Sequence, residues 1–381
     1  MSTARIIADY PSSIDTSSFD AINADTIRSS LRNIVINGDM LIAQRGTTKT
    51  IDRSFPTFSG YTTVDRWKSE TNVTDQVILT FSQDNDSPAE FEKSFKVLVA
   101  TPETTLDNDE YLRITHAIEQ QDLLRLNYGT ASPKSLTLSF WVKSGTVGVY
   151  SISLTGNDSA QRNVGSTYTV LVADTWEKKT VTFPGDAGGV MALSSAKGLK
   201  LHWTLSAGSN YTSQANGAWG AYNDNKMSTG QVANLMSTAS NYWNITGVQL
   251  EVGVNVTEFE HKPHHLELLM CQRYYQTINK RTVSVGVLGT SPYFNFNLPL
   301  CTPLNGDGLN PTVDIRVVSN KTLGDHANTT TISADPEVGT NGYQENATSV
   351  FMQIGGATGL TSTLIGVLSW DGFDMAFEAE L

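Results

Sequence analysis

Apolar and polar residues alternate with a period of two along most of this chain of 381 residues. In SLTLSFWVKS (135–144), four apolar residues from Leu136 to Val142 alternate with Ser, Thr and Lys, and Trp141 falls on the polar, outward side. Such alternation is typical of a β-strand with one buried and one exposed face. The same pattern recurs, between turns rich in Gly, Asn, Asp and Ser, at 110–118, 148–156, 176–185, 198–208 and 243–253. Six or more strands without a long helix between them predict an all-β fold, a two-sheet sandwich of the jelly-roll kind.

Residues 1–31 depart from this pattern. The first 18 residues are extended and rich in serine, and Phe19, Ile22, Ile27 and Leu31 then follow at about helical spacing. A helix this short is not stable by itself and must pack on another surface. We expect this N-terminal segment to pack on a neighbouring subunit or on the next domain.

A second departure, KPHHLELLMCQRYYQ (262–276), has helical spacing, with Pro263 near the first turn. Its apolar residues cover most of the helix circumference, which predicts a helix buried on more than one side. We therefore expect a linking helix that packs through Leu266, Leu269, Cys271, Tyr274 and Tyr275.

The alternating pattern resumes beyond Thr282, at 282–289, 293–300, 312–319, 349–356 and 364–381. This predicts a smaller C-terminal β-sandwich domain. The predicted organisation is therefore an extended and helical attachment segment (1–31), a jelly roll (32–262), a linking helix (263–281) and a C-terminal β tip (282–381).

Composition and charge exclude several classes of partner. The net charge is −12, from 26 basic and 38 acidic residues, and no basic stripe is present, so duplex nucleic acid is not an expected partner. Beyond Thr282 the chain has ten acidic residues and only two basic ones, Arg316 and Lys321, which is typical of a solvated outer domain.

Cys271 and Cys301 lack the spacing of a disulfide framework or a zinc cluster, and fit synthesis in a thiol-reducing cytoplasm. No run of 18 apolar residues and no N-terminal apolar core occur, so neither membrane insertion nor a secretory signal is expected.

Two groups of residues raise the question of chemistry. In EFEHKPHH (258–265), three histidines lie among glutamates, but Pro263 separates two of them and favours a solvated loop over a metal site. No catalytic motif of the hydrolase, metalloprotease or nucleotide-binding kinds occurs, so we expect a protein that is not an enzyme. In a long polar loop, Tyr211, Trp219 and Tyr222 are candidates for stacking on sugar rings, while packing is the more common role of such aromatics.

Three separated segments carry a resemblance to a known family. RNIVINGDMLIAQRGTT (32–48), GYTTVDRWK (60–68) and NITGVQLEVGVNVTEFEHKPHHLELLMCQRYYQ (244–276) resemble, in order, motifs of the carbohydrate-binding-module-like jelly roll of bacteriophage tail fibre and virion proteins. The resemblance implies a homotrimeric virion component, made in the host cytoplasm, that displays β modules outward toward host-surface glycans. It also implies that the N-terminal segment docks on other virion proteins.

The resemblance assigns roles to particular residues. Jelly rolls of this kind often hold a structural calcium ion, for which Asn37, Asp39 and Glu251 offer oxygen ligands here, with no other cofactor expected. Arg45, Asp65, Arg66 and Trp67 form a structural motif, in which Arg66 and Trp67 are expected to lock the first β hairpin to the sandwich. Trp67 is expected in the core, and Arg66 is expected to pair with a carboxylate such as Glu251.

The leading hypothesis is a phage fibre or tail appendage that contacts the host through the aromatic loop near Trp219 or the acidic tip. The alternative is a purely structural capsid or tail decoration protein without receptor binding. A glycan-degrading enzyme is a third class, disfavoured by the missing catalytic motifs.

Overall fold

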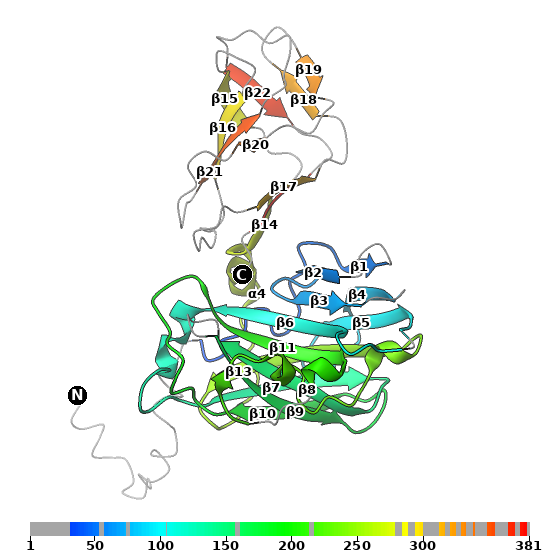
Figure 1. The fold of residues 1–381 in the computed structure, drawn as a ribbon. Helices are drawn as coiled ribbons and strands as arrows, with labels where there is room; N and C mark the ends of the chain where they lie inside the picture. Colours follow the sequence, from blue (N-terminus) through cyan, green and yellow to red (C-terminus); the bar gives the residue numbers. More distant parts are fainter. Residues whose placement is uncertain are drawn as a thin grey trace, which may run out of the picture.

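The computed structural model describes residues 31–52, 57–73, 77–103, 105–156, 161–212 and 217–276, the strand β14 (Tyr275–Ile278), and the backbone of nine further strands between 284 and 378. The predicted N-terminal helix lies outside the described residues. The whole described part is dominated by antiparallel β-strands (Figure 1).

Thirteen strands form two antiparallel sheets. The six-stranded sheet contains, in spatial order, β1 (Thr48–Ile51), β4 (Ile78–Asp84), β5 (Ser94–Thr101), β13 (Tyr242–Val252), β7 (Leu136–Ser144) and β10 (Glu177–Phe183). The seven-stranded sheet contains β12 (Gly220–Ala221), β9 (Arg162–Val170), β8 (Gly148–Gly156), β11 (Lys197–Ala207), β6 (Tyr111–Glu119), β3 (Lys68–Asn72) and β2 (Thr57–Tyr61).

The strand order identifies the sandwich as a jelly roll. Of the eight strands β5 to β11 and β13, the first pairs with the eighth, the eighth with the third and the third with the sixth in one sheet. In the other sheet the fifth, fourth, seventh and second are neighbours in that order. This alternation between sheets is the jelly-roll order of two Greek keys, and it confirms the predicted fold class.

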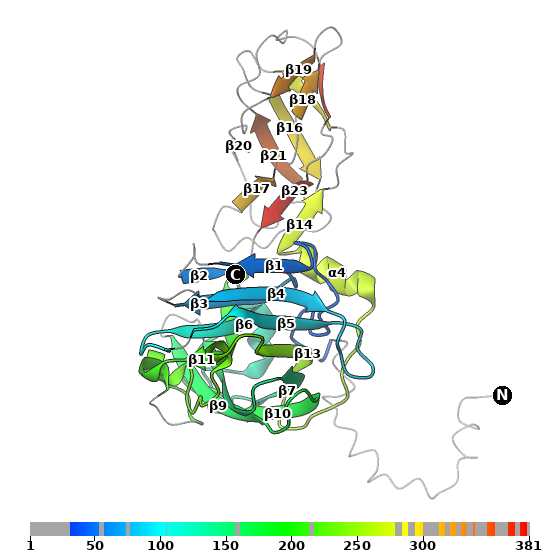
Figure 2. The ribbon, with the colours of Figure 1, turned by 90° about the vertical axis from the view of Figure 1, so that its right-hand side faces the viewer.

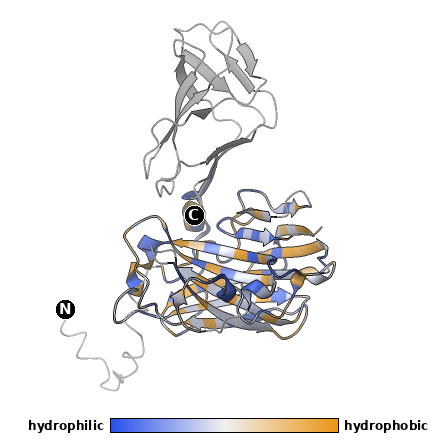
Figure 3. Cartoon of the chain, in the orientation of Figure 1, coloured by the Kyte–Doolittle hydropathy of each residue, from blue (hydrophilic) through white to orange (hydrophobic). Residues whose placement is uncertain are grey.

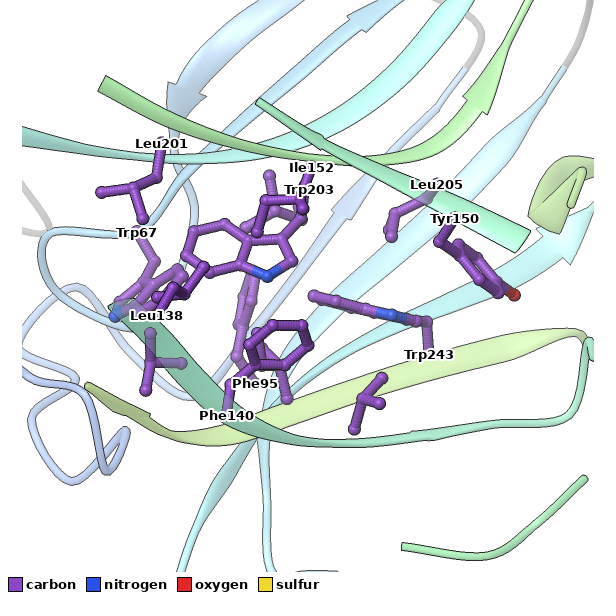
Figure 4. Packing of buried hydrophobic residues seen from close by; sticks show 14 of the residues in the cluster. Trp67, Phe95, Leu138, Phe140, Tyr150, Ile152, Leu201, Trp203, Leu205 and Trp243 are labelled. Atoms are coloured by element: carbon purple, nitrogen blue, oxygen red, sulfur yellow. The ribbon is translucent and has the colours of Figure 1, made fainter. Parts of the chain in front are cut away.

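The core lies between the two sheets and is built around three tryptophans (Figure 4). Trp67 and Trp203 are in contact, with ring centroids 5.2 Å apart, and Phe140 meets Trp203 edge to face at 5.9 Å. Trp243 donates its Nε1 hydrogen to the hydroxyl of Tyr168 over 3.1 Å. The predicted burial of Trp67 is confirmed, because none of its surface is exposed.

The expectation that one face of each strand is exposed is wrong for β7, although apolar and polar residues do alternate along the strands (Figure 3). Thr137 and Ser139, on its polar side, are buried, and Trp141 is only partly exposed. The chain that leaves β13 returns over this face, where Thr137 donates a hydrogen bond to the carbonyl of Gly253 over 2.8 Å.

The polar face of the seven-stranded sheet is also covered. The segment between β11 and β13 crosses it, and carries the short 3-10 helices η2 (Ser209–Tyr211), η3 (Asp224–Lys226) and η4 (Leu235–Ser237). Ser153 of β8 donates to the carbonyl of Met227 in this segment over 2.9 Å. Short-range alternation could not reveal these coverings, because each depends on a segment distant in the sequence.

The linking helix is shorter than predicted. It is α4 (His264–Gln272), and the chain enters β14 at Tyr275 instead of continuing as a helix to residue 281. A turn at Arg273 and Tyr274 separates the two elements, so both tyrosines of the expected helix lie beyond its end. The other 3-10 helix of the sandwich, η1 (Gln120–Leu126), follows β6.

The strands predicted in the C-terminal part are present, and they form two further sheets (Figure 2). One contains β14, β23 (Asp374–Glu378) and β17 (Thr312–Arg316). The other contains, in spatial order, β19 (Thr329–Ile332), β18 (Lys321–Gly324), β22 (Ile365–Ser369), β15 (Ser284–Leu288), β16 (Phe294–Pro299), β21 (Ser349–Ile354) and β20 (Val338–Gly339). Among the described helices, none has the length and apolar character needed to cross a bilayer.

Candidate functional site

The first sequence motif forms a turn that organises its surroundings. Asn37 adopts a left-handed conformation, with φ of 58°. Its side-chain Nδ2 donates to the carbonyls of Ile42 and Asp65, each over 2.9 Å, and its own carbonyl accepts from Trp67 Nε1 over 2.9 Å. A Cβ on Gly38 would lie 2.1 Å from the carbonyl oxygen of Val248, which explains why the turn has glycine there. The turn therefore joins the first motif to the second and to β13.

Asp65 of the second motif binds Gln44 and Arg45 of the first, and these two residues contact the third motif. The buried Asp65 carboxylate accepts from the backbone N–H of Gln44 over 3.1 Å and pairs with Arg45 Nη1 at 3.4 Å. The Arg45 guanidinium lies over the ring of Tyr275, 3.7 Å from its centroid. Gln44 Nε2 donates to the Tyr275 carbonyl over 2.9 Å. Residues separated by more than 200 positions thus meet at the start of β14.

Arg66 differs from its predicted role. It is buried, donates from Nη2 to the carbonyl of Ala117 over 2.7 Å, and lies over the ring of Tyr274 at 3.4 Å. Glu251, the carboxylate expected to pair with it, instead pairs with Arg32 Nε at 3.3 Å. Arg32 reaches Glu251 because the chain before β1 runs beside β13. The N–H of Ile34 donates to the carbonyl of Leu250, the neighbour of Glu251, and this places Arg32 next to the Glu251 carboxylate.

Glu119, which sequence reasoning missed, anchors the third motif. This buried carboxylate at the end of β6 accepts from Arg273 Nε and Nη2 over 2.8 and 3.1 Å, and from the Tyr274 hydroxyl over 2.6 Å. Burial raises the pKa of Tyr274, and the neighbouring Glu119 charge raises it further. The only signal of Glu119 in the sequence was its place, as an acidic residue directly after the predicted strand 110–118.

The helix α4 is not buried on more than one side, contrary to expectation. Leu266 is partly exposed and Leu269 is 42% exposed, while the buried residues are Glu267 and Cys271, four positions apart on one face. The Glu267 carboxylate accepts from the backbone N–H of Asn37 and lies 3.8 Å from Lys262 Nζ. Burial raises its pKa, against the lowering effect of Lys262. The helix therefore docks through the buried Cys271 and Glu267, with Leu268 and Met270 packed at the edge of the same cluster.

We call this meeting of the three motifs the joint: Asn37, Arg45, Asp65, Arg66, Glu119, Glu267, Arg273, Tyr274 and Tyr275. It lies where the jelly roll meets α4 and β14 (Figure 2). Its buried charges and stacked rings fix the direction in which the chain leaves the sandwich.

The residues expected to hold calcium do not fit that ion. The Asn37 side chain is committed to the backbone of Ile42 and Asp65, and Glu251 is neutralised by Arg32. Burial raises the pKa of Asp39, which disfavours the charged form that a hard cation needs. In the described part of the chain, no three His, Cys, Asp or Glu side chains are grouped as metal ligands.

The histidines before and in α4 have other surroundings. His264 and His265 are exposed in its first turn. His261 packs against the ring of Phe259, with centroids 4.9 Å apart.

A second cluster lies on the outer side of the seven-stranded sheet, at β6. The guanidinium of Arg113 lies over the rings of Tyr111 and Tyr211, 4.0 and 4.6 Å from their centroids. The two rings meet edge to face at 5.3 Å. Tyr222 is within electrostatic reach of Arg113, and its hydroxyl donates to Asp224 over 2.6 Å. We call Tyr111, Arg113, Tyr211 and Tyr222 the Tyr–Arg cluster.

Arg113 has no carboxylate partner among the described residues. Glu70 lies directly opposite it in the ladder of β3 and β6, but the Glu70 carboxylate pairs with Lys200 at 2.6 Å and Lys68 at 3.6 Å. Arg113 Nη2 donates to the hydroxyl of Ser228 over 3.3 Å, and its Nε is buried without an acceptor.

The electrostatics of the Tyr–Arg cluster reflect burial. Burial lowers the pKa of Arg113 and raises the pKa of Tyr111, Tyr211 and Tyr222, the last also through its bond to Asp224. For Glu70, burial would raise the pKa, but the charges of Lys200 and Lys68 lower it on balance. The Glu70 carboxylate of this face is therefore charged near neutral pH.

The structure separates the three aromatics predicted to bind sugar. Tyr211 and Tyr222 belong to the Tyr–Arg cluster, with Tyr222 39% exposed. Trp219 instead packs edge to face on Tyr128 at 5.9 Å and donates from Nε1 to the Pro184 carbonyl over 2.7 Å. Sequence reasoning missed Tyr111 and Arg113. Tyr111 and Arg113 are two positions apart in β6, so the sequence alone could have shown that both side chains lie on one face of the strand.

No protein-family model and no curated protein sequence matches the chain. Among solved structures it is similar to the enzymatically active domain of tailspike protein 4 of bacteriophage CBA120, with 14% identity and a TM-score of 0.28, over 49% of this chain and 19% of that one. It is also similar to a family 11 carbohydrate-binding module from Clostridium thermocellum in complex with a β-1,3-1,4-mixed-linked tetrasaccharide, with 13% identity and a TM-score of 0.26, over 57% and 99% of the two chains. A third is TmCBM61 in complex with β-1,4-galactotriose, with 10% identity and a TM-score of 0.26, over 58% and 99%. The chain thus spans about a fifth of the tailspike domain and nearly all of each binding module.

Proposed function

We propose that this chain is a non-enzymatic fibre or tail appendage protein of a phage virion, whose jelly roll binds glycans of the host surface. The observation that carries the proposal is the Tyr–Arg cluster on the outer side of the seven-stranded sheet. Sugar rings present apolar C–H faces and hydroxyl edges, so aromatic rings beside charged hydrogen-bonding groups suit them.

The chemistry of this face supports the assignment. Tyr111 and Tyr211 are partly exposed and held at right angles, with an interplanar angle of 88°. Beside Tyr111 lies the ion pair of Glu70 and Lys200, which makes this part of the face polar. Tyrosine rings lose little conformational freedom on binding, which favours a contact surface built from them.

The joint supports the appendage half of the proposal. Its buried ion pairs and stacked rings hold β14 at a set place on the jelly roll, and the C-terminal strands follow β14 in the chain. A protein that displays modules outward needs such a fixed exit. The same proposal takes the assembly as a homotrimer, attached to other virion proteins through residues 1–31.

Binding to host cells tests the proposal. Tyr211→Ala should weaken adsorption of the purified full chain to host cells, or to their isolated surface polysaccharide, by about tenfold, since a stacked aromatic contributes about 1–2 kcal/mol. Tyr242→Ala is the matched control, because Tyr242 is a partly exposed tyrosine of β13 in the other sheet. Equal loss in both variants, or none in either, would count against the Tyr–Arg cluster.

The alternative is a purely structural decoration protein, favoured by the extensive covering of both sheets. Labelling of the protein on intact particles, combined with host-cell adsorption, separates the two functions. Presence on the particle without adsorption of the purified chain would establish the structural role. Release of oligosaccharides from host polysaccharide would contradict the non-enzymatic assignment.

A further inference from the structure

We infer that the Tyr–Arg cluster selects saccharides that carry a carboxylate, with Arg113 as the group that recognises it. This inference rests on the proposed glycan-binding function and names the class of ligand. It follows from the state of Arg113, from the charges around it and from the geometry of the two tyrosines.

Arg113 is a buried cation whose hydrogen-bonding capacity is largely unused by the described residues. Only 5% of its surface is exposed, and guanidinium has five N–H donors. The structure gives it one weak hydrogen bond, to Ser228, and leaves Nε buried without an acceptor. A buried charge is costly unless it is compensated, and among the described residues the compensation of Arg113, by the Glu70 charge and two tyrosine rings, includes no direct ion pair. A ligand carboxylate would supply that pair.

The nearby carboxylates are already engaged. Glu70, opposite Arg113 in the ladder, is held by Lys200 and Lys68. Asp224 accepts from the Tyr222 hydroxyl. On the strands β3, β6 and β11, the cations Lys68, Arg113 and Lys200 therefore face one carboxylate, in a chain whose net charge is −12. Asp224 and Asp109 act on the tyrosines of the Tyr–Arg cluster and offset these cations in part, so the surface is less negative than the net charge of the whole chain would give.

The two tyrosines hold the guanidinium through their ring faces, without accepting hydrogen bonds from it. Contacts between a guanidinium and ring faces fix the plane of the group and use none of its N–H donors. A planar donor group of this kind matches the two oxygens of a carboxylate. The partly exposed faces of Tyr111 and Tyr211 suit the sugar ring that would carry it.

Acidic polysaccharides and their carboxyl-reduced forms provide the test, because reduction converts the carboxylate to a hydroxymethyl group on the same backbone. The probes are polygalacturonate, alginate, hyaluronan and polysialic acid, each paired with its reduced polymer, and the wild-type full chain is used. Binding to at least one acidic polymer should exceed binding to its reduced partner by about tenfold or more, the usual effect of a hydrogen-bonded charge. It should also weaken with added salt.

Variants locate the effect. Arg113→Gln should abolish the preference for the acidic polymer, and Arg113→Lys should retain part of it because the charge remains. Lys178→Gln, at an exposed position of β10 in the other sheet, removes the same charge and should leave the preference unchanged. Thermal unfolding of each variant checks that it is folded, while the wild-type comparison needs no variant.

The outcomes separate the two proposals. Equal binding to acidic and reduced polymers would overturn the carboxylate inference and leave glycan binding intact. Equal binding to a phosphate-bearing polymer such as teichoic acid would also overturn it. Failure to bind any polymer or host polysaccharide would overturn both.

Discussion

The guanidinium of Arg66 lies over the buried ring of Tyr274, 3.4 Å from its centroid, and thereby joins two motifs that are more than 200 residues apart. The guanidinium of Arg45 lies in the same way over the ring of the next residue, Tyr275. The two contacts place consecutive tyrosines against Arg66, in the turn between β2 and β3, and Arg45, just before β1. The separation of the motifs in the sequence is therefore a consequence of the jelly-roll order, which brings both ends of the sandwich to one place.

Tyr274→Ala should lower the free energy of unfolding by about 3–5 kcal/mol, the usual cost of emptying a large buried aromatic site. The loss includes the ring under Arg66 and the hydroxyl that bonds Glu119. Leu269→Ala, on the exposed side of α4, is the control and should change stability by no more than about 0.5 kcal/mol. Denaturant unfolding measures both, and similar losses in the two variants would show that the joint is not where the stability resides.

Trp67→Ala should cost about 3–5 kcal/mol, because Trp67 is fully buried against Trp203. Trp67→Phe tests a separate contribution: it keeps an aromatic ring but leaves the Asn37 carbonyl without the indole N–H, at a cost of about 1–3 kcal/mol. Denaturant unfolding of both variants gives the comparison. A Trp67→Phe protein as stable as the wild type would mean that the hydrogen bond to the Asn37 turn contributes nothing.

The jelly roll was predictable because period-two alternation is a local signal. The predicted strand at 148–156 is β8 to the residue, and 110–118 differs from β6 by one position at each end. Burial of both sheet faces was not predictable, because the covering segments come from distant parts of the chain. For the same reason the number of apolar residues in α4 overstated its burial. Leu269 is exposed and Leu266 and Leu268 are only partly buried, while the buried Glu267 accepts from a backbone N–H 230 residues earlier.

The candidate site was predictable only in part. Tyr211 and Tyr222 were found from their aromatic character in a polar loop, but Trp219 shares that character and packs elsewhere. Tyr211 and Tyr222 differ from Trp219 in lying near Arg113. The strand register places Arg113 of β6 between Glu70 of β3 and Thr204 of β11. Pairing between strands so far apart in the sequence is not encoded in any local pattern.

Chelation should leave the melting temperature unchanged. The expectation of a structural calcium ion named Asn37, Asp39 and Glu251. Other protein groups engage Asn37 and Glu251, and burial disfavours the charged form of Asp39, although Asp39 Oδ1 has no hydrogen-bond partner among the described residues. Thermal scans in calcium and in excess chelator should therefore coincide. A calcium-dependent rise in melting temperature that Asp39→Asn abolishes would restore the calcium site.

Acid should destabilise the sandwich through its buried histidines. Burial holds the pKa of His202 well below its usual value, and the charges of Lys200, Arg113 and Lys197 lower it further; burial acts in the same way on His116. In the unfolded chain a histidine takes up its proton near pH ~6.5, so below that pH the unfolded state binds more protons than the folded state. The stability contributed by a neutral His202 is therefore complete above pH ~6.5 and is lost as the pH falls, by up to about 1.4 kcal/mol per pH unit.

His202→Gln should make the decline in the free energy of unfolding between pH 7 and 5 shallower by that amount, whatever its effect at pH 7. His264→Gln, at an exposed position of α4, should leave the slope unchanged, and an unaltered slope in His202→Gln would assign the acid sensitivity to other groups.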